Sequence, residues 1–449
     1  VGSCAVPLTP AQEVAVQYAT SRRCSLVRGP PGTGKTHTAC AVIGRWCESV
    51  TRCRVLVVTQ SNAAALNIHQ RLEAFGLQSV RVGTHLKPEE LIQQRSLLSF
   101  FEPCDIQPLR EAIARGEAAP PAMVASLCQR AAKRAQAVVM TCISSGNAGL
   151  LGGCSFQRVL LDEAAQATEP TSLVPLMAGA AAFACIGDDK QLPASVYSQA
   201  ARARGLDESL FERLLRAGAV GFGDGFAQLD VQRRMHSAIA DFPGHFFYGG
   251  QLSNGISDVE RPPVPGLRWP GRGACRVLFV NVGGRLGREE MKGTSPFNQG
   301  EAELLVELLR HFLHTQAEAL DAPALRASDI AVITGYSAQR EAIRREISQT
   351  TLRSDPARSV RIDTVDGFQG MERELVLVSS TRSNAHSEVG FLKDPRRTNV
   401  LLTRARRGLV VFGDAQTLKS EEEVWGPWLR WVDDRGGFVD GSGLRALLT

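Results

Sequence analysis

Lysine and aromatic residues are scarce in this chain of 449 residues. Lys and Arg together number 51, and the printed rows contain only 7 lysines, so arginine supplies the remaining 44. Because a chain rich in Ala, Gly and Arg is also what GC-rich coding produces, the arginine total by itself does not indicate a phosphate-binding partner. The formal net charge of +5 is a mild basic bias that is compatible with nucleic acid without being diagnostic of it.

The sequence also lacks zinc motifs and membrane-spanning runs. The eleven cysteines form no Cys-x-x-Cys pair and have no histidine at a zinc-ligand spacing. Several, such as Cys142 and Cys185, lie in apolar runs, so we expect reduced, structural cysteines in a cytoplasmic or nuclear protein. No apolar stretch is long enough to span a bilayer, so we expect no membrane partner. Because the chain begins at Val1 without a leader pattern, we expect an internal segment of a longer protein.

A glycine-rich loop follows the first apolar run. Residues 25–36 read Ser-Leu-Val-Arg-Gly-Pro-Pro-Gly-Thr-Gly-Lys-Thr and match GxxxxGK[S/T]. In such a loop, backbone N–H groups turn toward phosphate oxygens, the lysine reaches the terminal phosphates and the threonine hydroxyl ligates Mg²⁺. An accidental match is the alternative, but one of only seven lysines stands at the required position. The loop therefore predicts a nucleotide site made of Gly29, Pro30, Pro31, Gly32, Thr33, Gly34, Lys35 and Thr36.

Apolar, β-branched runs of strand length recur along both halves of the chain. They occupy residues 25–28, 54–59, 138–142, 158–161 and 183–186 and, in a second series, 276–282, 330–334, 361–365, 375–380 and 408–412. Such runs, separated by helical stretches, are typical of buried parallel strands. The sequence therefore predicts an α/β fold with two parallel-sheet domains, 1–225 and 226–449, joined near Gly221–Gly225. Residues 86–136, rich in Ala, Leu, Gln and Arg, predict a helical pair inserted in the first domain.

Two carboxylates, Asp162 and Glu163, close one of these apolar runs. In a nucleotide hydrolase, Asp162 would hold Mg²⁺ through water and Glu163 would orient or deprotonate the attacking water. Acidic residues after a strand can also simply cap the next helix, but the phosphate loop favours the catalytic interpretation. Gln191, in Gly-Asp-Asp-Lys-Gln-Leu-Pro, would sense the terminal phosphate, with a surface turn as an equal alternative.

The second half contributes arginines in specific contexts, Gln-Arg-Arg-Met-His at 232–236 and Thr-Arg-Ala-Arg at 403–406. An arginine reaching the phosphates from the second domain would neutralise transition-state charge and couple hydrolysis to domain motion. Local pairing or solvation is the alternative for any single arginine. His236 is expected to support its motif by hydrogen bonding, because phosphoryl transfer needs no imidazole.

In their order along the chain, these motifs resemble those of superfamily 1 helicases. They are residues 29–36, 59–62, 162–166, 187–193, 232–236, 365–370 and 399–406. More narrowly, Asp-Glu-Ala-Ala-Gln-Ala-Thr-Glu-Pro at 162–170 and Asp-Pro-Arg-Arg-Thr-Asn-Val at 394–400 resemble the up-frameshift-like group. The resemblance implies two tandem RecA-like P-loop domains, with ATP and Mg²⁺ in the cleft and single-stranded RNA or DNA across the top. It also implies ATP hydrolysis coupled to 5′-to-3′ movement.

The resemblance assigns further residues by position. Gln12 matches the residue that reads adenine, Glu372 the acidic residue near the sugar, and Arg234 and Arg404 the two γ-phosphate arginines. Arg233 stands where the group generally has a tyrosine against adenine, and its guanidinium plane could stack there. The positions that usually line the strand-binding path are Ser61, Asn62, Thr141, Tyr336, Thr364 and Arg382.

Alternatives to a translocating helicase remain open at this stage. One is an ATP-gated RNA clamp or ribonucleoprotein remodeller that does not unwind, and another is a nucleotide-binding scaffold without turnover. Protein partners would act through parts outside this segment. Trp425, Trp428 and Trp431 resemble a base-stacking strip, but burial tendencies favour a helix packed onto the second domain.

Overall fold

The computed structural model describes residues 7–49, 53–83, 87–117, 120–218, 224–271, 275–284, 287–315, 325–349 and 355–449. The chain divides into two compact units. The first runs to Asp189 and resumes over Pro193–Asp230, and the second comprises Lys190–Leu192 and Val231–Thr449. The join predicted near Gly221–Gly225 lies partly outside the described residues.

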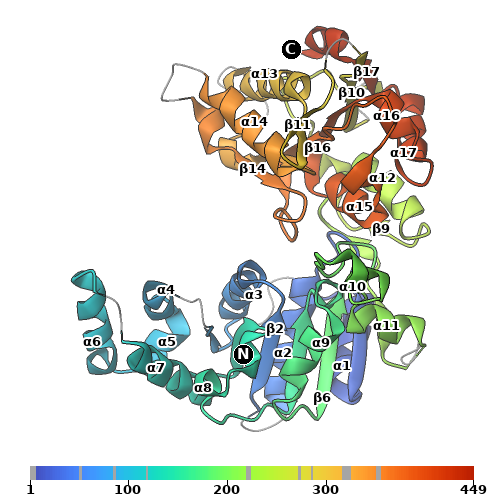
Figure 1. Ribbon diagram of the computed structural model, residues 1–449. Helices are drawn as coiled ribbons and strands as arrows, with labels where there is room; N and C mark the ends of the chain where they lie inside the picture. Colours follow the sequence, from blue (N-terminus) through green and yellow to red (C-terminus); the bar gives the residue numbers. More distant parts are fainter. Residues whose placement is uncertain are drawn as a thin grey trace. The chain divides into compact units, whose positions relative to one another are not determined.

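The first unit, coloured blue to green in Figure 1, is built on a seven-stranded sheet with the order β3-β4-β2-β5-β6-β1-β7. Every pairing in it is parallel. Its strands are β1 (Cys24–Arg28), β2 (Val55–Thr59), β3 (Ser79–Arg81), β4 (Ala137–Thr141), β5 (Arg158–Asp162), β6 (Ala182–Gly187) and β7 (Phe226–Gln228). Parallel strands need crossover connections, and helices supply them here.

Helices cover both faces of this sheet because successive strand residues point to opposite faces. Val27 and Val57 pack with α1 (Pro10–Ser21), α2 (Lys35–Ser49) and α3 (Asn62–Ala74). Leu26 and Leu56 pack with the helices of the other face. The remaining helices outside the insertion are α8 (Ala148–Leu151), α9 (Glu169–Leu176), α10 (Gln199–Ala203) and α11 (Leu210–Arg216).

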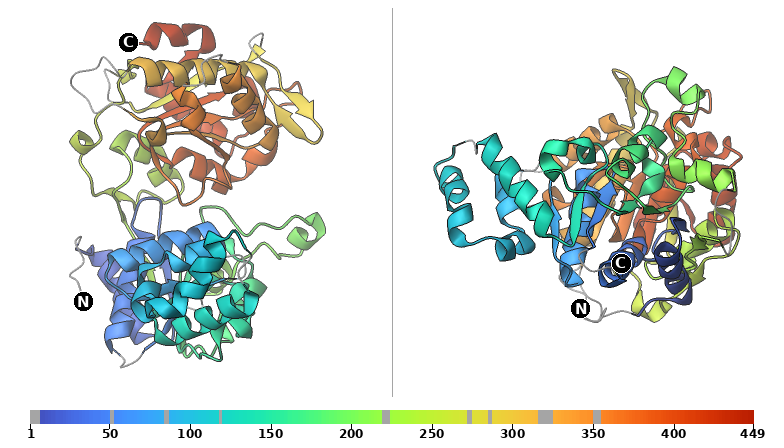
Figure 2. Two further views of the ribbon diagram at one scale, coloured as in Figure 1. Left: turned by 90° about the vertical axis from the view of Figure 1, so that its left-hand side faces the viewer. Right: turned by 90° about the horizontal axis from the view of Figure 1, so that it is seen from below.

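Between β3 and β4 the described residues form four helices, not the expected pair. They are α4 (Pro88–Ile92), α5 (Arg95–Phe100), α6 (Pro103–Ala114) and α7 (Pro121–Arg134). Proline begins three of them, because its fixed φ and missing N–H suit the first helical turn. Proline also prevents a preceding helix from continuing through it. Figures 1 and 2 show these helices projecting from the side of their own sheet that carries β3 and β4.

The second unit has a six-stranded parallel sheet with the order β14-β13-β15-β16-β10-β17. Its strands are β10 (Val277–Asn281), β13 (Ile330–Thr334), β14 (Arg361–Thr364), β15 (Arg373–Ser379), β16 (Ala405–Gly413) and β17 (Phe438–Asp440). Two small ribbons accompany it: β8 (Val231–Gln232) with β9 (Ser253–Asn254), and β11 (Glu290–Lys292) with β12 (Ser295–Phe297).

Helices again cover both faces of the second sheet. Leu278 and Val332 pack with α13 (Gln299–Thr315) and α14 (Ser337–Ser348). The other face packs with the remaining helices, α12 (Ser237–Phe246), α15 (Pro395–Leu402), α16 (Ala415–Lys419) and α17 (Trp425–Asp434). Leu192 joins this second core, which explains why Lys190–Leu192 groups with the second unit.

These observations confirm the α/β fold with two parallel-sheet units. The expected packing role of the tryptophans is also confirmed, because Trp425 and Trp428 are buried in α17. Ten of the eleven cysteines lie in described residues, and all ten are free thiols. Within the described ranges, no helix combines the length and the apolar composition needed to cross a membrane.

Candidate nucleotide and nucleic-acid sites

The phosphate loop connects the end of β1 to the first residue of α2, Lys35. The Nζ of Lys35 donates to the carbonyl oxygen of Gly29 at 2.8 Å, which folds the loop over on itself. A Cβ on Gly29 would lie 2.2 Å from the Cγ of Lys35, so only glycine fits at that position. Gly32 and Gly34 have φ of 76° and 81°, in the left-handed region that favours glycine. The loop thus precedes the positive end of a 15-residue helix, an arrangement suited to phosphate.

Gln12 anchors the first helix to this loop. Thr9 and Gln12 form a capping box at the start of α1, in which the Oε1 of Gln12 accepts from the backbone N–H of Thr9 at 2.9 Å. The Nε2 of Gln12 donates to the carbonyl oxygen of Thr33 at 3.0 Å. Gln12 therefore lies beside the phosphate loop, while adenine recognition stays a prediction.

Asp162 and Glu163 lie where β5 ends, two strands from β1 in the sheet order. Asp162 is 5% exposed, and burial together with the Glu163 charge raises its pKa to about 7, against the opposing charge of Lys35. Glu163 has φ of 54°, uncommon for a residue with a side chain, and its Oε2 accepts from the Nε2 of Gln166 at 2.9 Å. Such strained backbone is often found at functional sites.

The donors available near the loop fit Mg²⁺. Thr36, in the first turn of α2, offers a hydroxyl and Asp162 offers a buried carboxylate. Among the described residues there is no group of three or more His, Cys, Asp or Glu side chains that could enclose a metal ion. Mg²⁺ needs no such enclosure, because it is usually held by one or two protein ligands together with substrate phosphates and water.

In the second unit, two predicted arginines converge on Thr403. Arg404, 1% exposed, donates from NH2 to the Oγ1 of Thr403 at 2.9 Å and from Nε to the carbonyl oxygen of Val400 at 3.0 Å. Arg234 donates from NH1 to the carbonyl oxygen of Thr403 at 2.9 Å. The NH2 of Arg404 also donates to the Oε1 of Gln191 at 3.0 Å. Gln191, Arg234 and Arg404 therefore belong to one cluster.

Glu372 joins this cluster through Arg234, whose Nε donates to its Oε2. Burial acts to raise the pKa of Glu372, but the charges of Arg234, Arg406 and Arg404 outweigh it and hold the pKa below its usual value. Arg233, the residue expected to stack on adenine, has an exposed side chain, and its carbonyl oxygen accepts from Arg261. Contact of Glu372 or Arg233 with a nucleotide stays a prediction.

The residues of the first unit that are predicted to line the strand path lie at one edge of its sheet. Ser61 and Asn62 follow β2, Thr141 ends β4, and these two strands are neighbours in which Thr59 pairs with Thr141. Ser61 caps α3, its Oγ accepting from the backbone N–H of Ala64 at 3.2 Å. Ser61 and Asn62 are exposed. This edge is also the one at which β1 leads into the phosphate loop.

The residues of the second unit that are predicted to line the strand path lie together in the same way. Tyr336 follows β13, Thr364 ends β14 and Arg382 follows β15, and β13 pairs with both of the other strands. The NH1 of Arg382 donates to the Tyr336 hydroxyl at 3.4 Å, and that hydroxyl accepts from the backbone N–H of Phe391 at 3.0 Å. The predicted residues therefore share the carboxyl edge of each sheet, where ligands of open α/β sheets bind.

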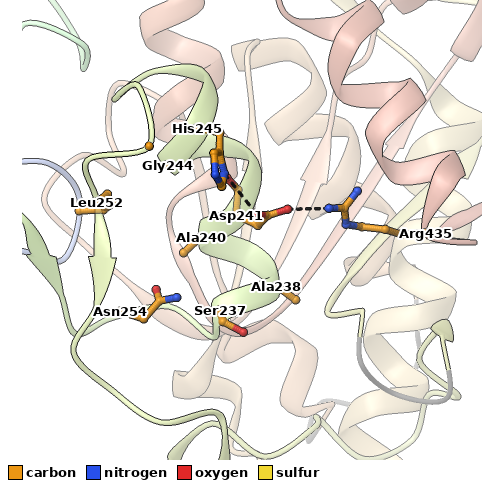
Figure 3. A pocket seen from close by; sticks show the side chains of 10 residues that line it. Ser237, Ala238, Ala240, Asp241, Gly244, His245, Leu252, Asn254 and Arg435 are labelled. Carbon is orange, nitrogen blue, oxygen red and sulfur yellow. Dashed lines mark hydrogen bonds and ion pairs between the residues drawn. The ribbon is translucent and has the colours of Figure 1, made fainter.

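A cavity of about 370 Å³ lies elsewhere in the second unit, between α12, the segment before β9, and the end of α17 (Figure 3). None of the predicted site residues lines it. Asp241 accepts there from the NH2 of Arg435 at 2.7 Å and from the Nε1 of Trp431 at 2.9 Å. Because these polar groups satisfy one another, the cavity is a poor candidate for the nucleotide site.

Sequence reasoning missed several residues that the structure places beside the predicted ones. Thr403 lay inside a recognised motif, but nothing in its spacing indicated that it accepts from two arginines. Arg28 and Asp189 form a bidentate ion pair next to the phosphate loop. Glu289 and Glu301 support the loop that carries Arg382, and both lie about 80 to 95 residues from it along the chain, where no local signal exists.

A phosphate loop at the end of an interior parallel strand, an acidic pair at a nearby strand end and a second parallel-sheet unit define a P-loop nucleotide-binding protein with two RecA-like units. Two family models, each described as an AAA domain, match residues 7–199 and 206–416. With its seven ordered motifs, the chain belongs to the superfamily 1 helicases of the up-frameshift-like group.

Individual relatives agree with this assignment. The chain is 34% identical over 453 residues to a regulator of nonsense transcripts 1 homolog of Arabidopsis thaliana, covering 97% of this chain and 34% of the relative. It is 32% identical to the ATP-dependent helicase NAM7 of Saccharomyces cerevisiae, covering 97% of this chain and 44% of that protein. The chain thus spans between a third and a half of these relatives' length. Among solved structures, an arterivirus nonstructural protein 10 (helicase) matches 89% of this chain and 61% of its own, with 15% identity and a TM-score of 0.42.

Proposed function

We propose that this chain is the motor region of a nucleic-acid-stimulated ATPase that moves 5′ to 3′ along single strands. The observation that carries the proposal is the Lys35 loop in the same unit as the buried Asp162 and the strained Glu163, together with the Arg234–Thr403–Arg404 cluster of the second unit. The relatives named as ATP-dependent helicases and as regulators of nonsense transcripts support it. Their names also make RNA the first substrate to test, with DNA as the comparison.

The residues of the first unit divide the work of binding and hydrolysis. The backbone of residues 29–34 and the Nζ of Lys35 would hold the phosphates, and Thr36 and Asp162 would hold Mg²⁺. The metal, when bound, supplies positive charge to the phosphate oxygens. Glu163 would take the proton from the attacking water. Gln12 and Arg233 would contact adenine, and Glu372 would contact the sugar.

The residues of the second unit would act on charge that develops during hydrolysis. Arg404 donates hydrogen bonds to Gln191 and Thr403, and Arg234 also donates to Thr403. A shift of any one of these side chains would therefore be transmitted to the others. In related phosphoryl-transfer enzymes an arginine of this kind accelerates turnover by roughly 10³ to 10⁵. Single strands would lie across Ser61, Asn62, Thr141, Tyr336, Thr364 and Arg382.

Phosphate release tests the proposal directly. Turnover is measured with Mg-ATP alone, with single-stranded RNA and with single-stranded DNA, using Glu163→Gln as the inactive control. We expect stimulation by at least one strand type, and affinity for it that falls as salt rises, because phosphate contacts release counterions. Absence of turnover in all three conditions would instead favour a nucleotide-binding scaffold.

Strand separation is tested on duplexes that carry either a 5′ or a 3′ overhang. We expect unwinding from the 5′ overhang only. ATP-dependent retention on single strands without unwinding or directional movement would favour a clamp or remodeller over a translocase.

A further inference from the structure

Glu301 is a fully buried carboxyl group outside every recognised motif, and burial raises its pKa to about 8. It lies in the first turn of α13, and its exposed fraction is 0%. Its Oε1 and Oε2 both accept from the backbone N–H of Thr381, at 3.0 and 2.9 Å. The hydroxyls of Ser379 and Ser380 also donate to it. A buried carboxyl group is tolerated only where hydrogen bonds replace its hydration, and here all of these donors come from one short segment, Ser379–Thr381.

Thr381 adopts a backbone conformation that is unfavourable for its β-branched side chain. Its φ is 74°, a genuine outlier for a β-branched residue, and it is fully buried. The Oγ1 atoms of Thr381 and Thr334 lie 3.1 Å apart, and the Nδ2 of Asn298 donates to the Thr381 carbonyl oxygen at 3.4 Å. Such strain persists only where surrounding contacts impose it. Glu301 is the group that engages the Thr381 N–H.

A second carboxylate holds the following residues. The Oε2 of Glu289 accepts from the Nε of Arg382 and from the backbone N–H of Ser383, both at 2.8 Å. The Arg382 guanidinium carbon lies 5.9 Å from the centre of the Tyr336 ring. A Cβ on Gly390 would lie 1.9 Å from the NH1 of Arg382, so the guanidinium occupies space that only glycine leaves open. The hydrogen bonds to Glu289 and Tyr336 use two of its five N–H donors.

We propose that Glu301 is a positioning residue for single-strand binding, which fixes the strained turn at Thr381 and thereby sets the Arg382–Tyr336 pair in its binding geometry. The inference rests on the proposed function, because it assigns a role within the strand path. It differs from a purely structural role, in which Glu301 would contribute to folding without any specific effect on strand affinity.

The test compares Glu301→Gln with the wild type in binding single-stranded RNA of fixed length over a series of salt concentrations. A carboxamide presents an N–H₂ group where one of the two Glu301 oxygens accepted from the backbone N–H of Thr381, so the turn loses part of its support. We expect affinity to fall on the order of tenfold, since apparent affinity scales with the population of the competent conformation. The slope of log K against log salt should also fall by about 0.7, the value for one phosphate contact on a single strand.

A double-mutant cycle identifies the path of the effect. If Glu301 acts through Arg382, then Glu301→Gln combined with Arg382→Ala should bind as Arg382→Ala alone does. Additive losses in the double variant would overturn the proposal. Asp355→Asn is the matched control, because Asp355 is also a buried carboxylate that accepts from a backbone N–H, that of Ala357, but it pairs with Arg310 and not with a strand-path arginine. We expect its strand affinity and salt slope to equal those of the wild type.

Ser379→Ala provides a second route if Glu301→Gln fails to fold. It removes one donor to Glu301 without changing charge, and we expect a smaller loss of affinity in the same direction. Wild-type affinity and salt slope in a folded Glu301→Gln, or in Ser379→Ala where Glu301→Gln does not fold, would overturn the proposal. Failure of the wild type itself to bind strands would instead count against the proposed function.

Discussion

Arg404 and Gln191 are joined by a hydrogen bond of 3.0 Å, although 213 positions separate them in the sequence. Gln191 is 4% exposed and Arg404 1%, so water does not compete for the pair. The same NH2 of Arg404 donates to Thr403, whose carbonyl oxygen accepts from Arg234. The three side chains predicted to respond to the terminal phosphate therefore form one connected network, and replacing any of them disturbs the others.

Replacing Arg404 should slow hydrolysis while leaving ATP binding intact. We expect Arg404→Ala to lower turnover on the order of 10³-fold or more, the effect of losing an arginine that stabilises transition-state charge. Arg404→Lys should rescue little, because an ammonium cannot reach Gln191, Thr403 and Val400 as the planar guanidinium does. Phosphate release and equilibrium binding of a fluorescent ATP analogue measure the two effects separately.

Arg407→Lys is the control for loss of a buried arginine. Arg407 is 5% exposed and donates to the carbonyl oxygens of Pro262 and Pro263, at 2.8 and 3.0 Å, whereas Arg404 donates to Gln191 and its neighbours in the cluster. The turnover of Arg407→Lys should therefore stay near that of the wild type. Equal turnover in wild type, Arg404→Ala and Arg404→Lys would remove Arg404 from the catalytic assignment.

Glu163→Gln should trap ATP. The amide keeps the volume of the side chain but cannot accept a proton, so hydrolysis should fall by roughly 10² to 10⁴, the usual contribution of a general base. Single-turnover hydrolysis measures the chemical step, and nucleotide binding should persist. Gln166→Ala leaves the carboxylate in place and removes only its 2.9 Å donor, so most of its turnover should remain. Wild-type hydrolysis by Glu163→Gln would show that another group is the base.

Much of the fold could be predicted from sequence because buried parallel strands are continuous apolar runs. The runs at 138–142 and 408–412, for example, correspond to β4 and β16. The edge strands β3, β7 and β17 were missed. Each has only three residues and forms by pairing with a strand that is distant in sequence. The insertion was predicted as helical, but its prolines divide it more finely than composition alone indicated.

The site could be predicted only where local sequence carries the chemistry. Lys35 in its glycine loop and Asp162 at the end of its strand are recognisable from spacing because a short segment supplies the whole geometry. The contacts of Glu301 could not be predicted from sequence, because its partners Ser379 and Thr381 are 78 and 80 positions away and no nearby residue indicates them. Whether Gln12, Arg233 and Glu372 contact a nucleotide depends on a bound ligand and stays a prediction.

The ion pair between Arg28 and Asp189 should stabilise the first unit next to the phosphate loop. The Nε and NH2 of Arg28 donate to the two Asp189 oxygens at 2.6 and 3.1 Å, and the side chains are 23% and 15% exposed. We expect Arg28→Gln and Asp189→Asn each to lower the free energy of unfolding by more than half of the decrease seen in the double variant. The coupling energy between the two residues should be about 1 kcal/mol. Urea unfolding of the four proteins measures the cycle.

Arg115 and Glu117 supply the control for that cycle. Their ion pair has a similar distance, 3.0 Å, but both side chains are 56% exposed. Solvent screening should reduce the coupling energy of Arg115→Gln and Glu117→Gln to near zero. Equal coupling in the two cycles would mean that burial beside the phosphate loop adds nothing to the Arg28–Asp189 interaction.

The first unit should lose stability in mild acid through His69. This histidine is 3% exposed, its Nδ1 lies 2.9 Å from the Ser79 hydroxyl, and burial, reinforced by Arg81 and opposed by Glu73, lowers its pKa to about 4. The unfolded chain binds a proton near pH 6.5, whereas the folded chain does so only near pH 4. The neutral, buried His69 therefore makes its full contribution to the free energy of unfolding above pH 6.5. This contribution disappears as pH falls to 4, a change on the order of 3 kcal/mol.

Urea unfolding of wild type and His69→Gln between pH 7.5 and 4 measures this contribution. The variant should lose less stability on acidification, because its amide does not titrate. His245→Gln is the control, since the side chain of His245 is 76% exposed, against 3% for His69. It should follow the wild-type pH profile. If His69→Gln also follows that profile, then carboxylates elsewhere account for the acid sensitivity, and the buried imidazole does not.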